Sequence, residues 1–392
     1  MTILTTNNQS LKVAIILAMT IALGPFALDT YLPAFPVIAA SLQVSVHQVS
    51  LTISVYIFVL AIGQLCGGPL SDHFGRSKIM LFGMGIFAVA SLLLVFAENL
   101  SEFLILRMLQ AFGGGCAAVT VPALIRDRIS GSEAAKFFSL IGLLMVLAPA
   151  LAPNIGALIL NFIDWHYIFI FLGVYALSVI VLLKTYVFRN EVKVLQQEKV
   201  SVWERYKQVM SDHSAMRLMF IGSLTFSVLM LFITHASFIY QQHFGVSPQL
   251  FSILFSSNVV LMLLMNIANR KLLNHFTPEV ILRWSLGLQA CALVLLLLVT
   301  LLYPQLWFFM AAVVLTIGFM GAISPNIQAC YMESFSTNTG TAAALKGATQ
   351  FSLAGLISAA STLLPESILS IVLAQALCLS IALILLWAKP YR

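Results

Sequence analysis

Two charged side chains interrupt long apolar stretches in the first third of the chain, and their chemistry most needs an explanation. Asp29 is the only acidic residue well inside an apolar run of the first half, and Arg107 lies about six residues inside another. A membrane interior penalises the charge of a carboxylate, whereas a neighbouring guanidinium stabilises it, so a carboxyl group under both influences can exchange protons near neutral pH. We interpret Asp29 and Arg107 as residues that couple proton movement to the movement of another solute.

Each of these residues also has a purely structural interpretation. Asp29 precedes Pro33 and Pro36 and could cap the end of an unwound helix. Arg107 is roughly 9 Å from the end of its run at 1.5 Å per residue, so its side chain could extend to the external interface. A charge that stays inside the membrane is costly unless it faces partner groups or water, which favours the functional interpretation of Arg107.

Polar and aromatic residues inside the apolar runs form a candidate substrate cavity, because aromatic rings with scattered amides suit apolar ligands. These residues are Tyr31, Tyr56, Gln64, Gln110, Phe226, His235, Tyr240, Asn258 and Gln350. Helix packing is the alternative for each of them, and a lone histidine such as His235 is often a hydrogen-bonded packing residue. Lys346 either extends to the cytoplasmic interface or lines the cavity and selects anionic or polar substrates.

The composition indicates which elements must position these residues. The chain has 392 residues, of which 60% are hydrophobic and 9% charged, whereas a soluble domain carries about 25% charged residues. Only a hydrocarbon solvent tolerates so much exposed apolar surface, so we expect membrane-spanning helices. Twelve apolar runs occur, at 11–34, 47–70, 78–97, 102–124, 135–161, 166–188, 217–241, 248–269, 279–302, 304–325, 340–363 and 367–388.

The positions of lysine and arginine agree with twelve spans, because these residues occur on the side of the membrane that twelve spans would place in the cytoplasm. With the N-terminus in the cytoplasm, the external breaks near 35–46, 98–101, 162–165, 242–247, 303 and 364–366 contain no lysine or arginine. Positive residues gather in the alternate breaks and in the polar stretch 189–215, as the positive-inside rule requires. The chain is therefore predicted to be an all-α membrane protein with twelve spans and both termini in the cytoplasm. It divides into a six-helix bundle at 1–188, a cytoplasmic linker at 189–215 and a second six-helix bundle at 216–392.

The break after the second run contains a recognisable motif, which reads GPLSDHFGRSK from Gly68. Asp72 ends one helix, Gly75 permits a tight reversal with positive φ, and Arg76 stays at the charged membrane face. The segment resembles the signature of the major facilitator superfamily. The resemblance implies that the carboxylate and the arginine form a cytoplasmic gate with the neighbouring half, joined by Asp127 after the fourth run. A turn that only sets topology is the alternative.

Two further segments resemble the same superfamily. Arg107 and Gln110 match an R-x-x-Q-G pattern, with Ala111 where glycine is common. Pro149, Pro153 and Gly156 in the fifth run resemble part of the antiporter motif found in exporters, although an ordinary kinked helix is the alternative. The resemblance implies a major facilitator fold that alternates between inward-open and outward-open states around a central cavity, with the helices of Asp29 and Arg107 adjacent.

The D-x-Y-L-P-A-x-P string from Asp29 and the G-Q-L-x-x-G-P-L-S-D string from Gly63 narrow this resemblance. Together with the Arg107 segment, they look like the Bcr/CflA branch of drug/proton antiporters, which includes chloramphenicol- and bicyclomycin-type exporters. The implied function is proton-coupled export of small, mostly apolar drugs. The alternative is a proton-coupled importer of a nutrient or metabolite with the same fold. A membrane sensor or enzyme is disfavoured, because no HExxH, GxSxG or paired catalytic aspartates occur.

The remaining expectations concern partners and location. The five cysteines are scattered singly without metal-ligand spacing, so we expect no metal site and no cofactor, with the proton gradient as energy source. The net charge of +6 follows topology and does not indicate nucleic-acid binding. Expected partners are drug-like small molecules, protons and membrane lipids. We expect a monomer in the bacterial inner membrane.

Overall fold

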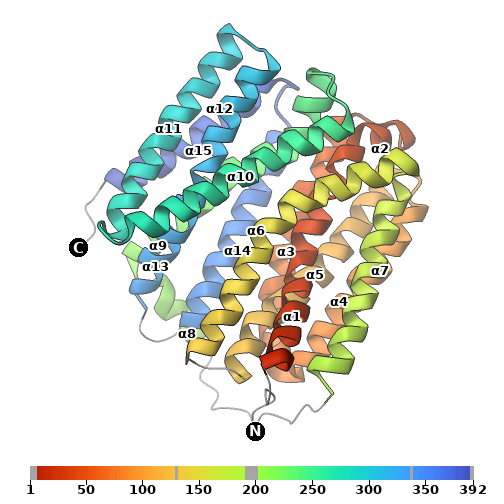
Figure 1. Ribbon diagram of the computed structural model, residues 1–392, viewed down its shortest axis with the longest axis vertical. Helices are drawn as coiled ribbons and strands as arrows, with labels where there is room; N and C mark the ends of the chain where they lie inside the picture. Colours follow the sequence, from red (N-terminus) through yellow and green to blue (C-terminus); the bar gives the residue numbers. More distant parts are fainter. Residues whose placement is uncertain (1–6, 129–130, 190–201, 336–338, 389–392) are drawn as a thin grey trace. The chain divides into compact units, whose positions relative to one another are not determined.

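The computed structural model describes residues 7–128, 131–189, 202–335 and 339–388, without the side chains of 7–11, 126–128, 131–146, 202–203, 205 and 339–340. Within these residues every regular element is a helix (Figure 1). The chain divides into two compact units, of which unit 1 comprises 1–43 and 55–200 and unit 2 comprises 44–54 and 201–392. The predicted division into 1–188, 189–215 and 216–392 stays a prediction, and residues 44–54 group with the second unit.

Unit 1 consists of long helices joined by short turns. Its elements are α1 (Asn7–Asp29), η1 (Leu32–Ala34), α2 (Phe35–Ser41), the larger part of α3 (Val46–Phe74), α4 (Arg76–Leu93), η2 (Leu94–Phe96), α5 (Leu100–Arg128), α6 (Gly131–Phe162), α7 (His166–Leu182) and η3 (Leu183–Val187). Helix α1 packs against α5, α6 and α7, and α4 packs against α5 and α7. Helices α1 and α5, which contain the two predicted proton-coupling residues, are therefore direct neighbours, as the family resemblance implied.

Unit 2 is also helical throughout its described part. Its elements, after the first residues of α3, are α8 (Val202–Met210), α9 (His213–Ser237), η4 (Phe238–His243), α10 (Pro248–Leu272), α11 (Pro278–Leu302), α12 (Leu306–Gly318), α13 (Met320–Glu333), α14 (Thr339–Ser361) and α15 (Ile368–Trp387). Helix α9 packs against α13, α14 and α15, whereas α11 packs against α12, α13 and α15.

Local sequence explains where several of these helices begin. Asp212 caps α9 by accepting hydrogen bonds from the backbone N–H groups of residues 214 and 215, each at 2.9 Å. Ser247 caps α10, and the next residue, Pro248, occupies the first helical position. A first-turn N–H has no partner inside the helix, so a capping oxygen or a proline is favourable there.

Ten helical segments in the described part of the chain are long and apolar enough to cross a membrane. They are 12–41, 46–74, 76–96, 100–125, 166–187, 213–243, 248–272, 278–302, 306–333 and 368–387. The other two predicted runs coincide with α6, whose apolar part is Leu147–Phe162, and with α14. The chain is therefore a multi-pass helical membrane protein, and the count of twelve spans and the location of the termini stay predictions.

Glycine residues bring neighbouring helices of unit 1 close together. A Cβ atom at Gly83 of α4 would lie 2.6 Å from the carbonyl oxygen of Gly113 of α5, and one at Gly63 of α3 would lie 2.5 Å from the oxygen of Phe112. Such distances leave no space for a side chain, so these helices pack backbone to backbone. Gly113 and Gly115 of α5 show the same close backbone approach, to Gly83 and Leu60 respectively.

Candidate functional site

Arg107 is the centre of a buried polar network in unit 1. It lies about two turns into α5, and none of its side chain is exposed. Its Nη1 donates a hydrogen bond to Oε1 of Gln110, and its Nη2 donates to the carbonyl oxygen of Ala27 at 3.1 Å. These contacts hold the guanidinium inside the bundle, so the alternative in which Arg107 extends to the external interface is wrong.

The network continues from α5 into α4. Nε2 of Gln110 donates to the hydroxyl oxygen of Ser91 at 2.7 Å, and that hydroxyl donates to the carbonyl oxygen of Phe87 at 2.7 Å. Gln110 therefore joins the Arg107 guanidinium to α4 through a buried chain of hydrogen bonds. The sequence did not point to Ser91. A serine in an apolar run can donate its hydroxyl to a carbonyl of its own helix, so it does not by itself indicate a contact with another helix.

Two tyrosine rings enclose the guanidinium. The Cζ atom of Arg107 lies 4.4 Å from the ring centroid of Tyr31 and 4.3 Å from that of Tyr56. A guanidinium at this distance from an aromatic face is stabilised by the ring quadrupole. Both tyrosines are fully buried, and no described residue forms a hydrogen bond with the hydroxyl of Tyr56. Arg107 is thus contacted by three of the predicted cavity residues, namely Tyr31, Tyr56 and Gln110.

Asp29 is buried at the end of α1, close in sequence to the carbonyl that Arg107 holds. The residue is 3% exposed, and its Oδ1 atom has no hydrogen-bond partner among the residues that the structure describes. Within the described part of the chain, no ion pair joins Asp29 to Arg107. Arg107 instead bonds to the backbone of α1 two residues before Asp29, because the carbonyl oxygen of Ala27 accepts from the guanidinium. A buried carboxyl group with no counter-ion among the described residues is expensive to hold as an anion.

Helix α6 packs directly against the backbone next to Asp29. A Cβ atom at Gly156 would overlap the carbonyl oxygen of Thr30, so only glycine fits this contact. Pro149 lies about two turns before Gly156 in the same helix, and Pro153 lies about one turn before it. Gly156 of the partial antiporter motif is therefore the point where α6 meets the backbone that follows α1, next to Asp29.

The predicted cavity residues of unit 2 lie in several separate places. Nε2 of His235 is 2.8 Å from the hydroxyl of Ser361, and its ring stacks on His47 with centroids 5.4 Å apart. Nε2 of His47 is 2.7 Å from the carbonyl oxygen of Thr362. His47 belongs to the short first part of α3 that groups with this unit, a placement that no local sequence signal reveals.

The other residues of this set have varied surroundings. Tyr240 is fully buried among the rings of Phe232, Phe251 and Phe309, and Asn258 donates to the carbonyl oxygen of Phe255 on its own helix. These are packing positions in the interior of unit 2. By contrast, Phe226 and Gln350 are partly exposed, and Phe226 contacts the ring of Phe351 edge to face. In unit 1, Gln64 is also partly exposed.

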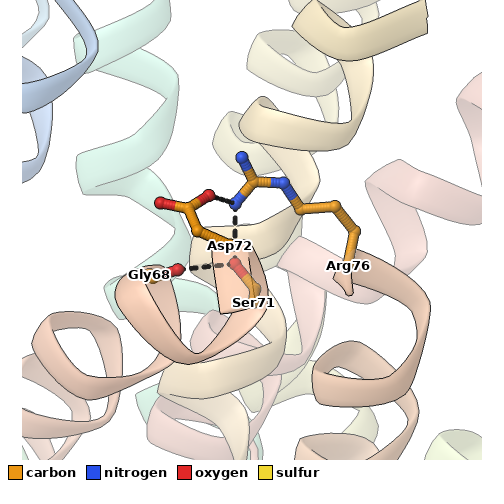
Figure 2. A network of polar contacts seen from close by, with 4 residues as sticks. All are labelled: Gly68, Ser71, Asp72 and Arg76. Atoms are coloured by element: carbon orange, nitrogen blue, oxygen red, sulfur yellow. Dashed lines mark hydrogen bonds and ion pairs between the residues drawn. The ribbon is translucent and has the colours of Figure 1, made fainter. Parts of the chain in front are cut away.

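The predicted gate motif forms a compact network where α3 meets α4 (Figure 2). Asp72 and Arg76 form an ion pair at 2.5 Å, and Nη1 of Arg76 also donates to the hydroxyl of Ser71 at 2.7 Å. That hydroxyl donates to the carbonyl oxygen of Gly68 at 2.7 Å. The prediction of a positive φ is confirmed at Gly75, where φ is 102°. Asp127 lies outside the residues whose side chains are described.

These observations define first a class of protein and then a family. An all-helical, multi-pass membrane bundle with buried polar groups around an arginine is typical of membrane transport proteins. The model of the Major Facilitator Superfamily matches residues 17–359. The chain therefore belongs to this superfamily, and it is a transporter rather than an enzyme.

Individual relatives agree with this assignment. The bicyclomycin resistance protein homolog of Haemophilus influenzae is 31% identical over 362 residues, which cover 90% of this chain and 89% of that protein. The chloramphenicol resistance protein of Pseudomonas aeruginosa is 36% identical over 163 residues, which cover 40% of this chain and 39% of that protein. A crystal structure of a D-xylose–proton symporter matches with a TM-score of 0.76 over 98% of both chains at 15% identity, and this likeness shows a shared fold.

Proposed function

We propose that this protein exports small, mostly apolar drugs from the bacterial cytoplasm across the inner membrane, in exchange for protons. The observation that carries the proposal is the carboxyl group of Asp29, which is buried in α1 and has neither a counter-ion nor a hydrogen bond to Oδ1 among the described residues. The family is one of transporters, and relatives over most or part of the chain are named for resistance to bicyclomycin and chloramphenicol.

In the proposed cycle, Asp29 takes up a proton from outside and releases it to the cytoplasm when a drug binds. Ala27 connects the two key residues, because a change in charge at Asp29 alters the field at the carbonyl that Arg107 holds. The guanidinium then changes its contacts with Gln110 and the tyrosine rings, and the protein alternates between its two access states. The proton gradient supplies the energy, and no cofactor takes part. We propose that one chain is sufficient, with lipids as its surroundings.

The proposal is tested by drug-driven proton release from the purified protein in weakly buffered detergent. Chloramphenicol is the probe, because it is uncharged and cannot itself contribute a proton. The wild-type protein should release protons on mixing, whereas Asp29→Asn should release none yet still bind the drug. Asp164→Asn is the matched control, since Asp164 is an exposed carboxylate beside His166 and should leave release unchanged. Release by Asp29→Asn equal to that of wild type would exclude this carboxyl group from coupling.

The direction of transport needs a separate measurement. In everted vesicles, an acid interior should drive accumulation of chloramphenicol if the protein exchanges drug for protons. A proton-coupled importer would instead expel its substrate from the same vesicles. The opposite response to one gradient therefore distinguishes export from import.

A further inference from the structure

Lys346 is a buried cation of unit 2 that the proposed coupling does not use. It lies about two turns into α14, and only 7% of the residue is exposed. Its aliphatic stem passes close to Gly222 of α9, where a Cβ atom would lie 3.7 Å from Cε of Lys346. The lysine therefore extends between α9 and α14, two helices that pack against each other.

The ammonium group has neutral neighbours. It donates a hydrogen bond to Oε1 of Gln328 on α13, and Nζ lies 5.9 Å from the ring centroid of Tyr331 on the same helix. The hydroxyl of Tyr331 is directed elsewhere, since it donates to the carbonyl oxygen of Ala342 at 2.9 Å. One amide oxygen and one aromatic face thus stabilise the charge, which leaves the ammonium with further N–H groups to donate.

No carboxylate in the described part of the chain pairs with Lys346. The ion pairs found there join Asp72 to Arg76, Asp164 to His166 and Glu279 to Arg283. A buried ammonium without an anion is costly, and lysines that serve only stability are rarely buried unless they are paired. Because no described residue supplies a counter-charge, this position is one that a bound anion would complete.

Gln328 gives this position access to a ligand. Its side chain is exposed although the lysine that it holds is buried, so the amide lies between Lys346 and the surface of unit 2. When Oε1 of Gln328 accepts from Lys346, the orientation of the amide is fixed, and its NH₂ group can still donate a hydrogen bond to a ligand. An ammonium N–H and an amide N–H side by side match the two oxygen atoms of a carboxylate.

We propose that Lys346 and Gln328 form a substrate subsite for a carboxylate or a similar anionic oxygen. The proposal rests on the proposed function and extends the substrates from uncharged drugs to acidic ones. In this subsite Lys346 supplies the charge, Gln328 orients it and donates a second hydrogen bond, and the remainder of the drug contacts apolar surface.

The test compares two probes with the same skeleton, nalidixic acid and its uncharged primary amide. Binding to the purified full-length protein is measured by isothermal titration calorimetry in a non-ionic detergent. Lys346→Gln should weaken binding of the acid at least tenfold and change binding of the amide less than threefold, whereas Lys346→Arg should retain preference for the acid. Lys271→Gln is the matched control, because Lys271 is exposed at the end of α10 and should leave both affinities unchanged.

A second variant keeps the test informative if Lys346→Gln does not fold. Gln328→Glu places a carboxylate beside the ammonium, so it should abolish preference for the acid and leave the unfolding temperature unchanged or higher. The subsite is wrong if either folded variant binds the acid and the amide in the same ratio as wild type. It is also wrong if phosphatidylglycerol nanodiscs remove the preference of wild type for the acid, because a lipid phosphate then occupies the position.

Failure of this inference is distinguishable from failure of the proposed function. If chloramphenicol export persists while the preference for the acid does not depend on Lys346, only the proposed subsite is wrong. If wild type exports neither chloramphenicol nor nalidixic acid, the drug-export function itself is wrong, whatever the binding ratios show.

Discussion

At the scale of single residues, the buried charges are stabilised by neutral groups. Arg107 contacts the carbonyl of Ala27, the amide of Gln110 and two tyrosine faces, with no carboxylate paired to it in the described part of the chain. Such an environment is polar enough to hold a guanidinium and still lets its contacts change when a nearby group gains or loses charge. A tight ion pair with Asp29 would be harder to rearrange, because separating two buried charges is costly.

Arg107→Lys is predicted to reduce both stability and drug-driven proton release, although it retains the positive charge. A lysine lacks the planar fork that bonds to two acceptors and stacks between two rings. We expect a loss of about 2–3 kcal/mol in stability, the value of one or two hydrogen bonds to a charged group, and loss of drug-driven proton release. Thermal and denaturant unfolding of the purified protein measure the first effect.

The control for this substitution is Arg283→Lys. Arg283 forms a partly exposed pair with Glu279 on the same helix, so its replacement should cost less than about 1 kcal/mol. Equal destabilisation by the two variants would contradict the role assigned to the fork of Arg107.

At the scale of elements, glycines determine how closely the helices of unit 1 approach. Gly156 brings α6 against Thr30 beside Asp29, and Gly83 and Gly113 bring α4 against α5. Lipid provides no hydrophobic force that drives helices together, so close backbone contact and its van der Waals attraction contribute much of the association energy. The position of the Asp29 carboxyl group therefore depends on a residue of another helix that has no side chain.

Gly156→Ala and Gly24→Ala are predicted to have opposite effects on stability. An added methyl group at Gly156 overlaps the Thr30 carbonyl and forces α6 away from α1, at a cost of about 1–3 kcal/mol. At Gly24 of α1 no atom lies within 4 Å of an added Cβ, so alanine should gain up to about 1 kcal/mol of helix propensity. Unfolding temperatures of the two variants provide the comparison, and a stabilised Gly156→Ala protein would show that the α1–α6 contact is looser than described.

At the scale of the whole molecule, the distribution of lysine and arginine predicts the orientation of the chain in the membrane. The polar connector and the breaks at Arg76 and Lys271 should lie in the cytoplasm, whereas the break at Glu366 should lie outside. An even number of spans with both ends in the cytoplasm satisfies all of these positions. In the proposed cycle, this orientation also sets the side of the membrane from which Asp29 would take up a proton.

Labelling of single cysteines tests the orientation. In a protein whose five native cysteines are replaced, Glu366→Cys should react with a membrane-impermeant maleimide in intact cells. Lys271→Cys should react only after the cells are permeabilised, and both positions are exposed enough for the reagent. Labelling of Lys271→Cys in intact cells would contradict the predicted topology.

The sequence by itself showed that this protein lies in a lipid bilayer and identified the residues whose charge is costly there. Apolar runs identified the helices, and Asp29, Arg107 and Lys346 were conspicuous because a charge inside such a run is costly. Gly75 was predictable as well, since a sharp reversal between two helices requires a positive φ. These conclusions depend only on local composition and on the properties of lipid.

The tertiary structure decided what each of these residues contacts. Arg107 bonds to a carbonyl 80 residues away in the chain, Gly156 meets Thr30, and His47 stacks on His235. Tyr240 lies in an aromatic interior, although its sequence surroundings resemble those of the cavity candidates. Lipid accepts any apolar face of a helix, so hydropathy cannot show which face turns toward another helix. Only the packing of distant segments selects it.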